Sequence, residues 1–308
     1  MAGGAEQGRI GPGNRGRCPG GRAVKPPRRI TVFTHHYPED TRAAVLRLVE
    51  KVRDRGVEVR FPPAEVEKHS IDDQDGCVLN ANEDDATDLA IVFGGDGTIL
   101  TALRACAVSG APVFGFNYGA IGFLSTVERD QLDEGIDRAL SGDFDVLKMP
   151  ALETEVGGQR RMGVNDISLH RRANSRVATL EYSVGSEQLG RVRSDGLVAA
   201  TPVGSTGYNL ANGGPVLAWG VEGYVVSFIA PHTLTARALV VAPGDALRVA
   251  NASERDAVDI TTDGRPVGEL VPGESVELRF RDDQVSLAQL DGATFYHRFR
   301  EKFGRLAY

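Results

Sequence analysis

Short apolar runs alternate with helical patterns between residues 29 and 145, and no other feature restricts the fold of this chain as strongly. The apolar runs of strand length stand at 30–34, 57–60, 88–93 and 112–117. The segments of helical pattern stand at 39–56, 98–110 and 129–142. In the first of these, four valines and leucines follow the spacing of one helix face, and Gly56 stands where that helix should end. Strands that alternate with helices predict βαβ units and a parallel sheet, so we expect an α/β domain over 29–145.

The character of the sequence changes after residue 146. Short runs bounded mostly by Gly, Asp, Asn or Pro follow one another, at 163–170, 177–185, 196–202, 224–230, 238–243, 246–250, 257–264, 275–280 and 284–290. Hardly a helical pattern separates them, which predicts a β-rich domain over 146–292. The last segment, 293–308, places Phe295, Phe299 and Phe303 four residues apart, as in an amphipathic helix. We expect this helix to pack back on the first domain.

Residues 1–28 are rich in Gly, Pro and Arg and have almost no large apolar side chains. Such a segment buries too little apolar surface to become ordered, so we expect a disordered basic tail. It is either an interaction tail, an over-long start of the reading frame or a segment without function.

Composition limits the functional class. The chain has 308 residues, of which 41% are hydrophobic, enough for two domains with sizeable cores. No apolar run approaches the roughly 20 residues needed to cross a bilayer, and the N-terminus lacks the apolar core of a signal peptide. We therefore expect a soluble cytoplasmic protein with no membrane partner. A net charge of −7 argues against a nucleic-acid partner. Three widely spaced cysteines and six scattered histidines indicate neither a disulfide framework nor a metal site.

The first site-like stretch, "IVFGGDGT" (91–98), ends an apolar strand on two glycines and a carboxylate. Ligands of parallel α/β sheets bind beyond the carboxyl ends of the strands. Glycines let a backbone approach a phosphate, and the helix that follows offers free N–H groups. A carboxylate repels phosphate, however, so Asp96 needs another role. It could hold Mg²⁺, accept a proton from an attacking hydroxyl, or simply cap a helix that begins at Thr98.

Two further stretches combine small polar residues with glycines. In "SDGLVAATPVGSTGYNLANGGP" (194–215), hydroxyl and amide side chains surround an apolar strand and a glycine-rich segment. These groups either recognise a flat polar ligand or bond to their own backbone in turns. Asn165-Asp166, at the start of a strand, suits base and ribose recognition, but is also common in a strand-entry turn.

Together, in this order and spacing, the three stretches resemble the motifs of the NAD kinase family. These are GGDGT, an Asn-Glu pair and a TPTGSTAY-like run ending in GGP. They stand here as GGDGT (94–98), ND (165–166) and TPVGSTGYNLANGGP (201–215). The segments GFLS (122–125), APH (230–232) and DGR (263–265) also look like that family. The resemblance covers about residues 29–291 and implies a Rossmann-like α/β domain, a β-sandwich-like domain and a C-terminal segment that returns to the first domain.

The resemblance also implies an activity, the transfer of the γ-phosphoryl group of ATP or another donor to the 2′-hydroxyl of the adenosine ribose of NAD. Asp96 would be the catalytic base. The residues that would bind NAD are Gly95, Gly97, Phe123, Asn165, Asp166, Asp195, Thr206, Gly207 and Tyr208. Those that would lie near the phosphates and the donor are Gly94, Thr98 and Asp263. Mg²⁺ or another divalent cation would accompany ATP without metal ligands of its own in the chain, and the family's homodimers or homotetramers would share Asp195 across an interface.

Three positions depart from the family pattern. Asp166 replaces Glu and is shorter by about 1.5 Å, the length of one C–C bond. Gly207 stands where Ala is usual, and Val203 replaces Thr. Lipid kinases of the diacylglycerol and sphingoid type also carry GGDGT, but they should show a membrane-facing patch of basic and aromatic residues, and the ordered part of this sequence has none. A non-catalytic NAD(P)-binding sensor is a third alternative, but it would be expected to have lost Asp96.

Overall fold

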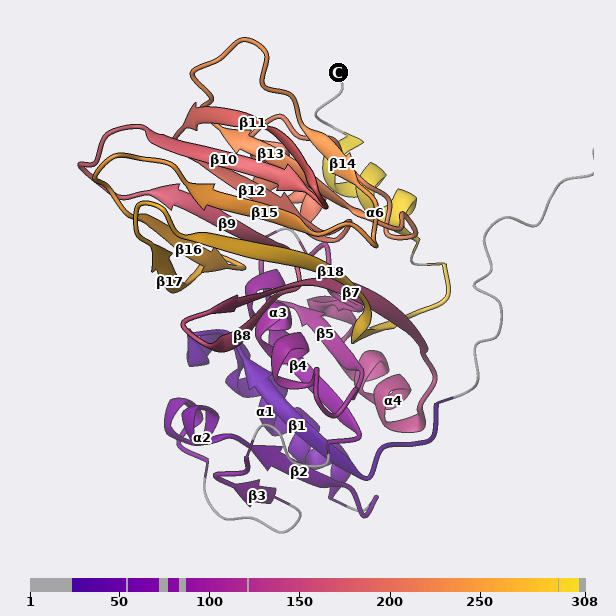
Figure 1. Ribbon diagram of the computed structural model, residues 1–308. Helices are drawn as coiled ribbons and strands as arrows, with labels where there is room; N and C mark the ends of the chain where they lie inside the picture. Colours follow the sequence, from indigo (N-terminus) through magenta and orange to yellow (C-terminus); the bar gives the residue numbers. More distant parts are fainter. Residues whose placement is uncertain are drawn as a thin grey trace, which may run out of the picture.

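The computed structural model describes residues 24–53, 55–71, 77–82, 87–120, 122–292 and 294–304. The α/β part, drawn from indigo to magenta in Figure 1, contains β1 (Arg29–Thr34), α1 (Pro38–Val52), β2 (Glu58–Phe61), α2 (Pro63–His69), β3 (Cys77–Leu79), β4 (Leu89–Gly94), α3 (Asp96–Ala105), β5 (Val113–Asn117), β6 (Val127–Glu128) and α4 (Leu132–Ser141). Its strands β5, β4, β1, β2 and β3 lie side by side in that order and pair in parallel.

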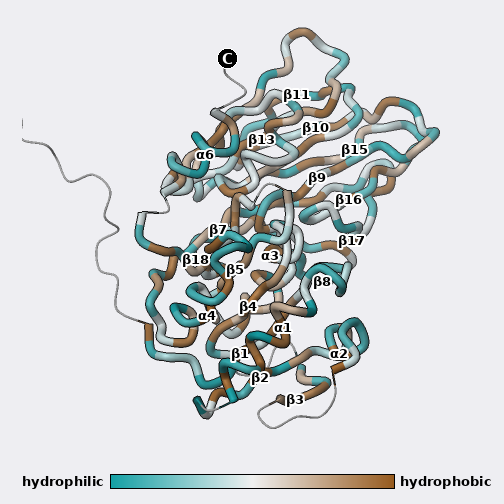
Figure 2. Tube along the Cα trace, turned by 180° about the vertical axis from the view of Figure 1, so that it is seen from behind, coloured by the Kyte–Doolittle hydropathy of each residue, from teal (hydrophilic) through white to brown (hydrophobic). Residues whose placement is uncertain are grey.

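The central strand β4 is buried on both faces. Leu89, Ile91 and Phe93 face α1 and α4, whereas Ala90 and Val92 face α3. This two-sided burial explains why the run is apolar throughout, without the alternation of a half-exposed strand. The brown stretches of Figure 2 follow β1 and β4 through this part of the molecule. The chain runs outward from β1 to β3 and then returns to the other side of β1, so the sheet reverses its order between β1 and β4.

The β-rich part contains β7 (Asp145–Val156), β8 (Gln159–Gly163), β9 (Asp166–Arg171), β10 (Ala178–Val184), β11 (Glu187–Ser194), β12 (Gly196–Ala200), α5 (Tyr208–Ala211), β13 (Tyr224–Ile229), β14 (Leu239–Val241), β15 (Leu247–Asn251), β16 (Val258–Thr262), β17 (Arg265–Leu270) and β18 (Ser275–Gln289). A six-stranded sheet, ordered β14-β13-β12-β9-β16-β17, packs on β10, β15 and β18 around a shared apolar core. This is the expected sandwich.

The long strands β7 and β18 join the two parts (Figure 1). Leu287 of β18 pairs in parallel with Val113 of β5, and the first half of the same strand pairs with β15. The register of β18 against β7 shifts between Arg281 and Val285, opposite Pro150. Proline cannot donate a ladder hydrogen bond, and an irregular register there lets both strands bend from one part to the other. The predicted boundary at 145/146 falls at the start of β7.

The last helix, α6 (Phe295–Phe303), packs against the loop that follows β5, as expected for a segment that returns to the first domain. Its N-cap Thr294 accepts a hydrogen bond from the backbone N–H of His297.

Three sequence expectations need correction. Residues 24–28, assigned to the disordered tail, belong to the fold, because Pro27 is buried and Arg28 accepts a hydrogen bond from the N–H of Glu58. Residues 1–23 lie outside the described part of the chain. The runs at 275–280 and 284–290 form one strand, in which the polar residues between them make the register shift. Helix α3 begins at Asp96 and ends at Ala105, earlier at both ends than expected.

Candidate active site

The β4–α3 turn places Asp96 at the carboxyl edge of the parallel sheet. Gly95 is the N-cap of α3, and no side chain provides a capping hydrogen bond there. The alternative in which Asp96 caps a helix beginning at Thr98 is therefore wrong. The carboxylate instead reaches across to the loop after β5, where its Oδ2 accepts the N–H of Phe123 at 3.0 Å and its Oδ1 the N–H of Leu124 at 2.9 Å.

Asp96 is mostly removed from water, and its surroundings act on its charge in opposite directions. Burial raises the pKa of the Asp96 carboxyl, whereas the N–H groups of Leu124 and Phe123 and the charge of Arg298 lower it. Each carboxylate oxygen has a second lone pair, so both remain able to accept a proton or a hydrogen bond. Such a group suits a general base held in a fixed orientation.

The three glycines of this turn differ in their surroundings. A Cβ on Gly95 would lie 3.3 Å from the Cα of Gly119, so the loops after β4 and β5 touch there. A Cβ on Gly97 would meet nothing within 4 Å. The protein itself therefore has no packing reason for glycine at 97, and the open space over the first turn of α3 is available to a ligand. Gly94 lies against the side chain of Thr98, which a Cβ at 94 would approach to 2.5 Å.

Asp263 ties the β-rich part to α3. Its side chain is fully buried and accepts hydrogen bonds from Arg104 of α3 and from the N–H groups of Val164, Asn165 and Asp166, the last two at 2.7 and 3.2 Å. All these donors belong to the protein, so Asp263 holds the Asn165-Asp166 turn against α3. Its φ of 46° is the left-handed conformation that Asp tolerates better than most residues.

The Asn165-Asp166 turn faces the 201–215 segment. The N–H of Thr201 donates to the carbonyl of Asn165 at 2.9 Å, and a Cβ on Gly204 would lie 2.0 Å from the same oxygen. The side-chain Oδ1 of Asn165 is buried without a hydrogen-bond partner. Buried polar atoms normally have partners, so this oxygen is a candidate contact for a donor group of a ligand. Burial, and then the charge of Asp263, raise the pKa of Asp166 to about 7.

The 201–215 segment divides into an internal part and a surface part. Thr201, Ser205 and Asn209 are fully buried, and their side chains donate hydrogen bonds to backbone carbonyls of the protein. These three residues therefore follow the alternative in which the polar side chains stabilise turns. Thr206, Gly207 and Tyr208 lie at the surface of the segment, and the Tyr208 ring stacks on His170 with centroids 5.5 Å apart. The charges of Asp166 and Asp195, after burial, raise the pKa of Tyr208, so both carboxylates lie near its hydroxyl.

The remaining predicted residues have clear surroundings. Asp195 pairs with Arg171, whose Nε lies 2.5 Å from its Oδ1. Phe123 is 4% exposed, and its ring contacts Trp219, Phe295 and Phe303 instead of open space. Val203, the departure from the family pattern, is buried in the cluster formed with α3 and therefore serves packing.

Sequence reasoning missed Arg104, His170 and Arg298, which support the predicted residues from a second layer. Each lies far along the chain from its partner, as Arg104 does from Asp263, 159 positions away. The sequence signal for them is an arginine or histidine at a position where an apolar residue would be expected, on the inward face of a helix or strand.

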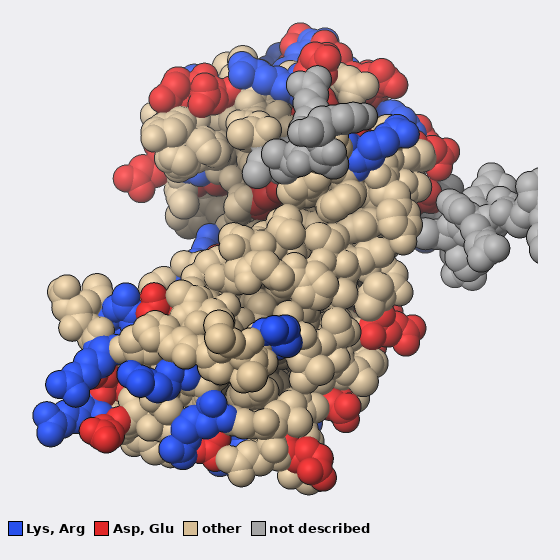
Figure 3. All heavy atoms as spheres, turned by 90° about the horizontal axis from the view of Figure 1, so that it is seen from above, with Lys and Arg blue, Asp and Glu red and all other residues tan. Residues whose placement is uncertain are grey.

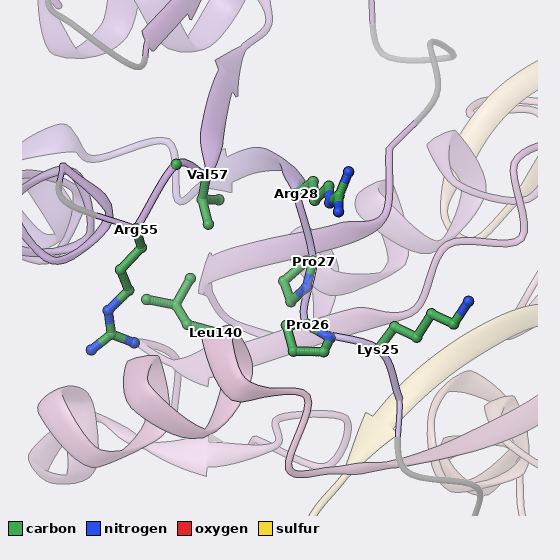
Figure 4. Close-up of a pocket in the computed structure, with 8 residues that line it drawn as sticks. Lys25, Pro26, Pro27, Arg28, Arg55, Val57 and Leu140 are labelled. Atoms are coloured by element: carbon green, nitrogen blue, oxygen red, sulfur yellow. The ribbon is translucent and has the colours of Figure 1, made fainter.

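Further features of the described residues lie away from the predicted site. A cavity of about 440 Å³ lined by Lys25, Pro27, Arg55, Val57 and neighbours opens at the opposite, amino-terminal edge of the strands (Figure 4). Within the described ranges, no three His, Cys, Asp or Glu side chains are grouped so as to hold a metal ion. No helix in the described part of the chain has the length and apolar character to cross a membrane. On the face seen in Figure 3, acidic side chains accompany the basic ones around a broad uncharged area.

Family models match both parts of the chain. The model of the ATP-NAD kinase N-terminal domain matches residues 44–144, and that of the ATP-NAD kinase C-terminal domain matches residues 164–290. An NAD kinase of Carboxydothermus hydrogenoformans is 31% identical over 264 residues, which cover 83% of this chain and 92% of that protein. An NAD kinase of Symbiobacterium thermophilum is 36% identical over 220 residues, 70% of this chain and 78% of that protein.

Two solved structures share the fold. Yeast NADH kinase complexed with NADH superposes with a TM-score of 0.80 at 22% identity, covering 91% of this chain and 88% of that one. An NAD kinase from Archaeoglobus fulgidus in complex with ATP gives a TM-score of 0.68 at 23% identity, covering 91% and 98%. Both halves of the sequence, the fold and the assembled motifs agree, and the chain belongs to the NAD kinase family.

Proposed function

We propose that this protein transfers the γ-phosphoryl group of ATP to the 2′-hydroxyl of the adenosine ribose of NAD, with Asp96 as the proton acceptor. The observation that carries the role of Asp96 is its geometry. Two backbone N–H groups fix the carboxylate at the carboxyl edge of the sheet. Beside it lies Gly97, where no packing contact in the protein requires a glycine. As the ribose oxygen attacks the γ-phosphorus, its proton passes to Asp96. The bond from the γ-phosphorus to the bridging oxygen breaks and ADP leaves.

The acceptor site is proposed to lie between α3 and the β9–β12 end of the β-rich part. Asn165 supports this because its buried Oδ1 lacks a partner, and Asp166 because its buried carboxyl group acts on the nearby Tyr208 hydroxyl. We assign the adenosine part of NAD to Asn165, Asp166, Thr206, Gly207 and Tyr208. Asp195 is assigned to the nicotinamide end, in a homodimer or homotetramer that completes the site. Asp263 is assigned to positioning the Asn165-Asp166 turn near the phosphates.

The donor is proposed to lie at the point where the sheet reverses its order, between β1 and β4. Such a crevice is the usual nucleotide position in doubly wound sheets. The N–H of His35, just after β1, donates to the carbonyl of Phe93 at the end of β4, so the two loops run together there. Gly94, Gly97 and Thr98 line the start of α3, whose free N–H groups suit phosphate oxygens.

A divalent cation, Mg²⁺ for example, is proposed to arrive with the triphosphate. Mg²⁺ usually binds through substrate phosphates, water and one or two carboxylates. Asp96 retains free lone pairs and fits a single contact of this kind, and the cation would neutralise charge on the phosphates. We further propose that the protein works in the cytoplasm. The lipid-kinase alternative and the sensor alternative receive no support from the comparisons, since both family models and the relatives described above are NAD kinases.

The deciding experiment is an assay of purified protein with ATP, Mg²⁺ and NAD, in which an NADP-specific dehydrogenase detects the product. Parallel reactions with other nucleoside triphosphates, polyphosphate and NADH establish the donor and acceptor. Asp96→Asn is expected to lower kcat at least a thousandfold and to leave the Kd for NAD within about threefold. Absence of NADP with every donor contradicts the proposed activity, and wild-type turnover by the Asn variant contradicts the role of Asp96.

A further inference from the structure

Arg298 is a buried cation on the last helix, close to the proposed base. It is 6% exposed, although arginine rarely lies so deep. Its Nη1 donates to the carbonyl oxygens of Phe123 at 3.1 Å and Ser125 at 2.5 Å. Its Nη2 donates to Oε1 of Gln289, the last residue of β18, at 2.7 Å. The guanidinium therefore fastens the loop after β5 from the side of α6.

The same loop holds Asp96 from its other side. The N–H of Phe123 donates to the Asp96 carboxylate, while the carbonyl of Phe123 accepts from Arg298. A single peptide segment, 123–125, thus bonds to both charged side chains. A shift of this segment by a fraction of an ångström would move the two N–H groups that orient the carboxylate.

An aromatic cluster shields this arrangement from water. The Phe123 ring contacts Trp219 and Phe295 with centroids 5.7 and 5.9 Å apart, and the Arg298 guanidinium lies 5.8 Å from the Trp219 ring centre. In such a poorly hydrated place, one charge acts on another more strongly than at the surface. The charge of Arg298 favours the ionised form of Asp96, and Asp96 in turn favours the charged form of Arg298.

Among the described residues, few other charges act on this pair. Lys302, also on α6, acts on Asp96 in the same direction as Arg298, but it is partly exposed and lies 3.6 Å from Glu128 of β6. Glu128 and Glu301 act on Arg298. Among the charged side chains of the described residues, Arg298 therefore has the largest effect on Asp96, after burial and the two backbone N–H groups.

We propose that Arg298 is a positioning residue for phosphoryl transfer, which fixes the 123–125 segment behind Asp96 and places its positive charge near the carboxylate, so that catalysis requires the docked C-terminal helix. This inference rests on the proposed role of Asp96. It adds that the site is assembled from the two parts and the last helix. Arg298 acts through the loop after β5, because its described hydrogen bonds go to that loop and to Gln289.

The test compares three full-length variants in the NADP-forming assay from pH 5 to 9. Arg298→Met removes the charge and the donors. For this variant, the acid limb of the kcat–pH profile is expected to shift to higher pH by about one unit. At pH 7 its kcat should be at least tenfold lower than that of the wild type, and its KM for NAD should change by less than threefold. Arg298→Lys keeps the charge, so its acid limb should stay at the wild-type position. Arg300→Met, on the exposed side of the same helix, is the matched control and should behave as wild type.

Trp219 fluorescence and circular dichroism establish the folded fraction of each variant. If the Met variant does not fold, Arg298→Gln, which retains a donor for the loop without the charge, takes its place. A folded neutral variant with the wild-type acid limb overturns the inference, as does a Lys variant whose limb moves as far as that of the neutral one. Asp96→Asn separates the two hypotheses. If it retains activity, the proposed base is wrong. If it is inactive while the profile of the neutral Arg298 variant is unchanged, only the inference fails.

Discussion

Gly97 occupies the first turn of α3 and is exposed, yet its missing side chain leaves open space above the helix. Glycine in a helix costs about 1 kcal/mol relative to alanine, so a position without a packing reason for glycine needs another explanation. A substrate that lies against the backbone provides one.

We expect Gly97→Ala to raise the free energy of unfolding by about 0.5 kcal/mol while lowering kcat/KM at least tenfold. Urea denaturation and initial-rate kinetics measure the two quantities. Gly244→Ala, also in open space but at a position outside the proposed site residues, is the control and should leave kcat/KM unchanged. Full activity in the Gly97 variant would show that no ligand approaches this turn.

The pH dependence of Asp166 follows from the direction of its pKa. The pKa is raised from 3.8 to about 7 by burial and by Asp263, so between these values the folded protein retains a proton that the unfolded chain releases. The penalty for burying the group is therefore absent below pH 4, grows as the pH rises and is complete above 7.

Asp166→Asn removes this penalty. Its gain in unfolding free energy over wild type should be larger at pH 8 than at pH 5.5, by about 2 kcal/mol. Denaturant titrations at the two pH values measure it, with Asp145→Asn at an exposed position as the control. An ionised carboxylate is also the better acceptor for ribose hydroxyls. The affinity of the wild type for NAD should therefore increase between pH 6 and 8, and that of the Asn variant should stay flat. A pH-independent gain would contradict the raised pKa.

At the scale of the elements, α6 and the loop after β5 form one unit through their aromatic rings. Trp219 is the only tryptophan of the chain and contacts both Phe123 and Phe295, so its emission reports whether the helix is docked. Phe295 is 9% exposed, whereas its neighbour Tyr296 is 71% exposed.

Phe295→Ala should lower the free energy of unfolding by about 3 kcal/mol, shift the Trp219 emission to longer wavelength and reduce kcat. Tyr296→Ala, one position along the helix, should change none of these. Unchanged Trp219 emission in the Phe295 variant would mean that the tryptophan does not depend on the helix. Fluorescence spectra and thermal melts of the two variants, recorded side by side, provide the measurement.

The elements that sequence patterns predicted correctly are those with a clear apolar face. The strand ending in GGDGT and the helix with Val45 and Leu48 on one side were found because their burial matches a period of the sequence. The strands β7, β8, β11 and β17 were missed, since they are rich in charged residues, and since Pro150, Gly190 and Gly268 interrupt β7, β11 and β17. Backbone hydrogen bonds to neighbouring strands stabilise them, and a local sequence pattern does not predict those bonds.

At the scale of the whole molecule, the two parts share β7 and β18. Met149, Val285 and Leu287 of these strands lie in the same apolar cluster as α3, and so does Val203 of the β-rich part. The apolar cluster around α3 is therefore complete only when both parts are present.

We therefore expect one cooperative thermal transition for the full chain, with the calorimetric enthalpy of unfolding close to the van't Hoff enthalpy. A fragment of residues 24–144, which lacks the β18 partner of β5, should show no cooperative transition. Differential scanning calorimetry tests both statements. Two resolved transitions in the full chain would indicate that β7 and β18 do not couple the parts.

The sequence by itself determined the family, the α/β and β-rich halves and the position of Asp96, because glycine turns, apolar periodicity and the order of the motifs are local properties. Only the tertiary structure decided what each side chain does. In the folded chain, Asp263 is buried among four donors of the protein, and Val203 packs in the apolar cluster around α3. Arg298 lies behind the loop that orients Asp96. The physical reason is that these roles depend on hydrogen bonds and contacts between residues about a hundred or more positions apart. The free energy of such contacts comes from burial and charge in the folded state, which no short stretch of sequence contains.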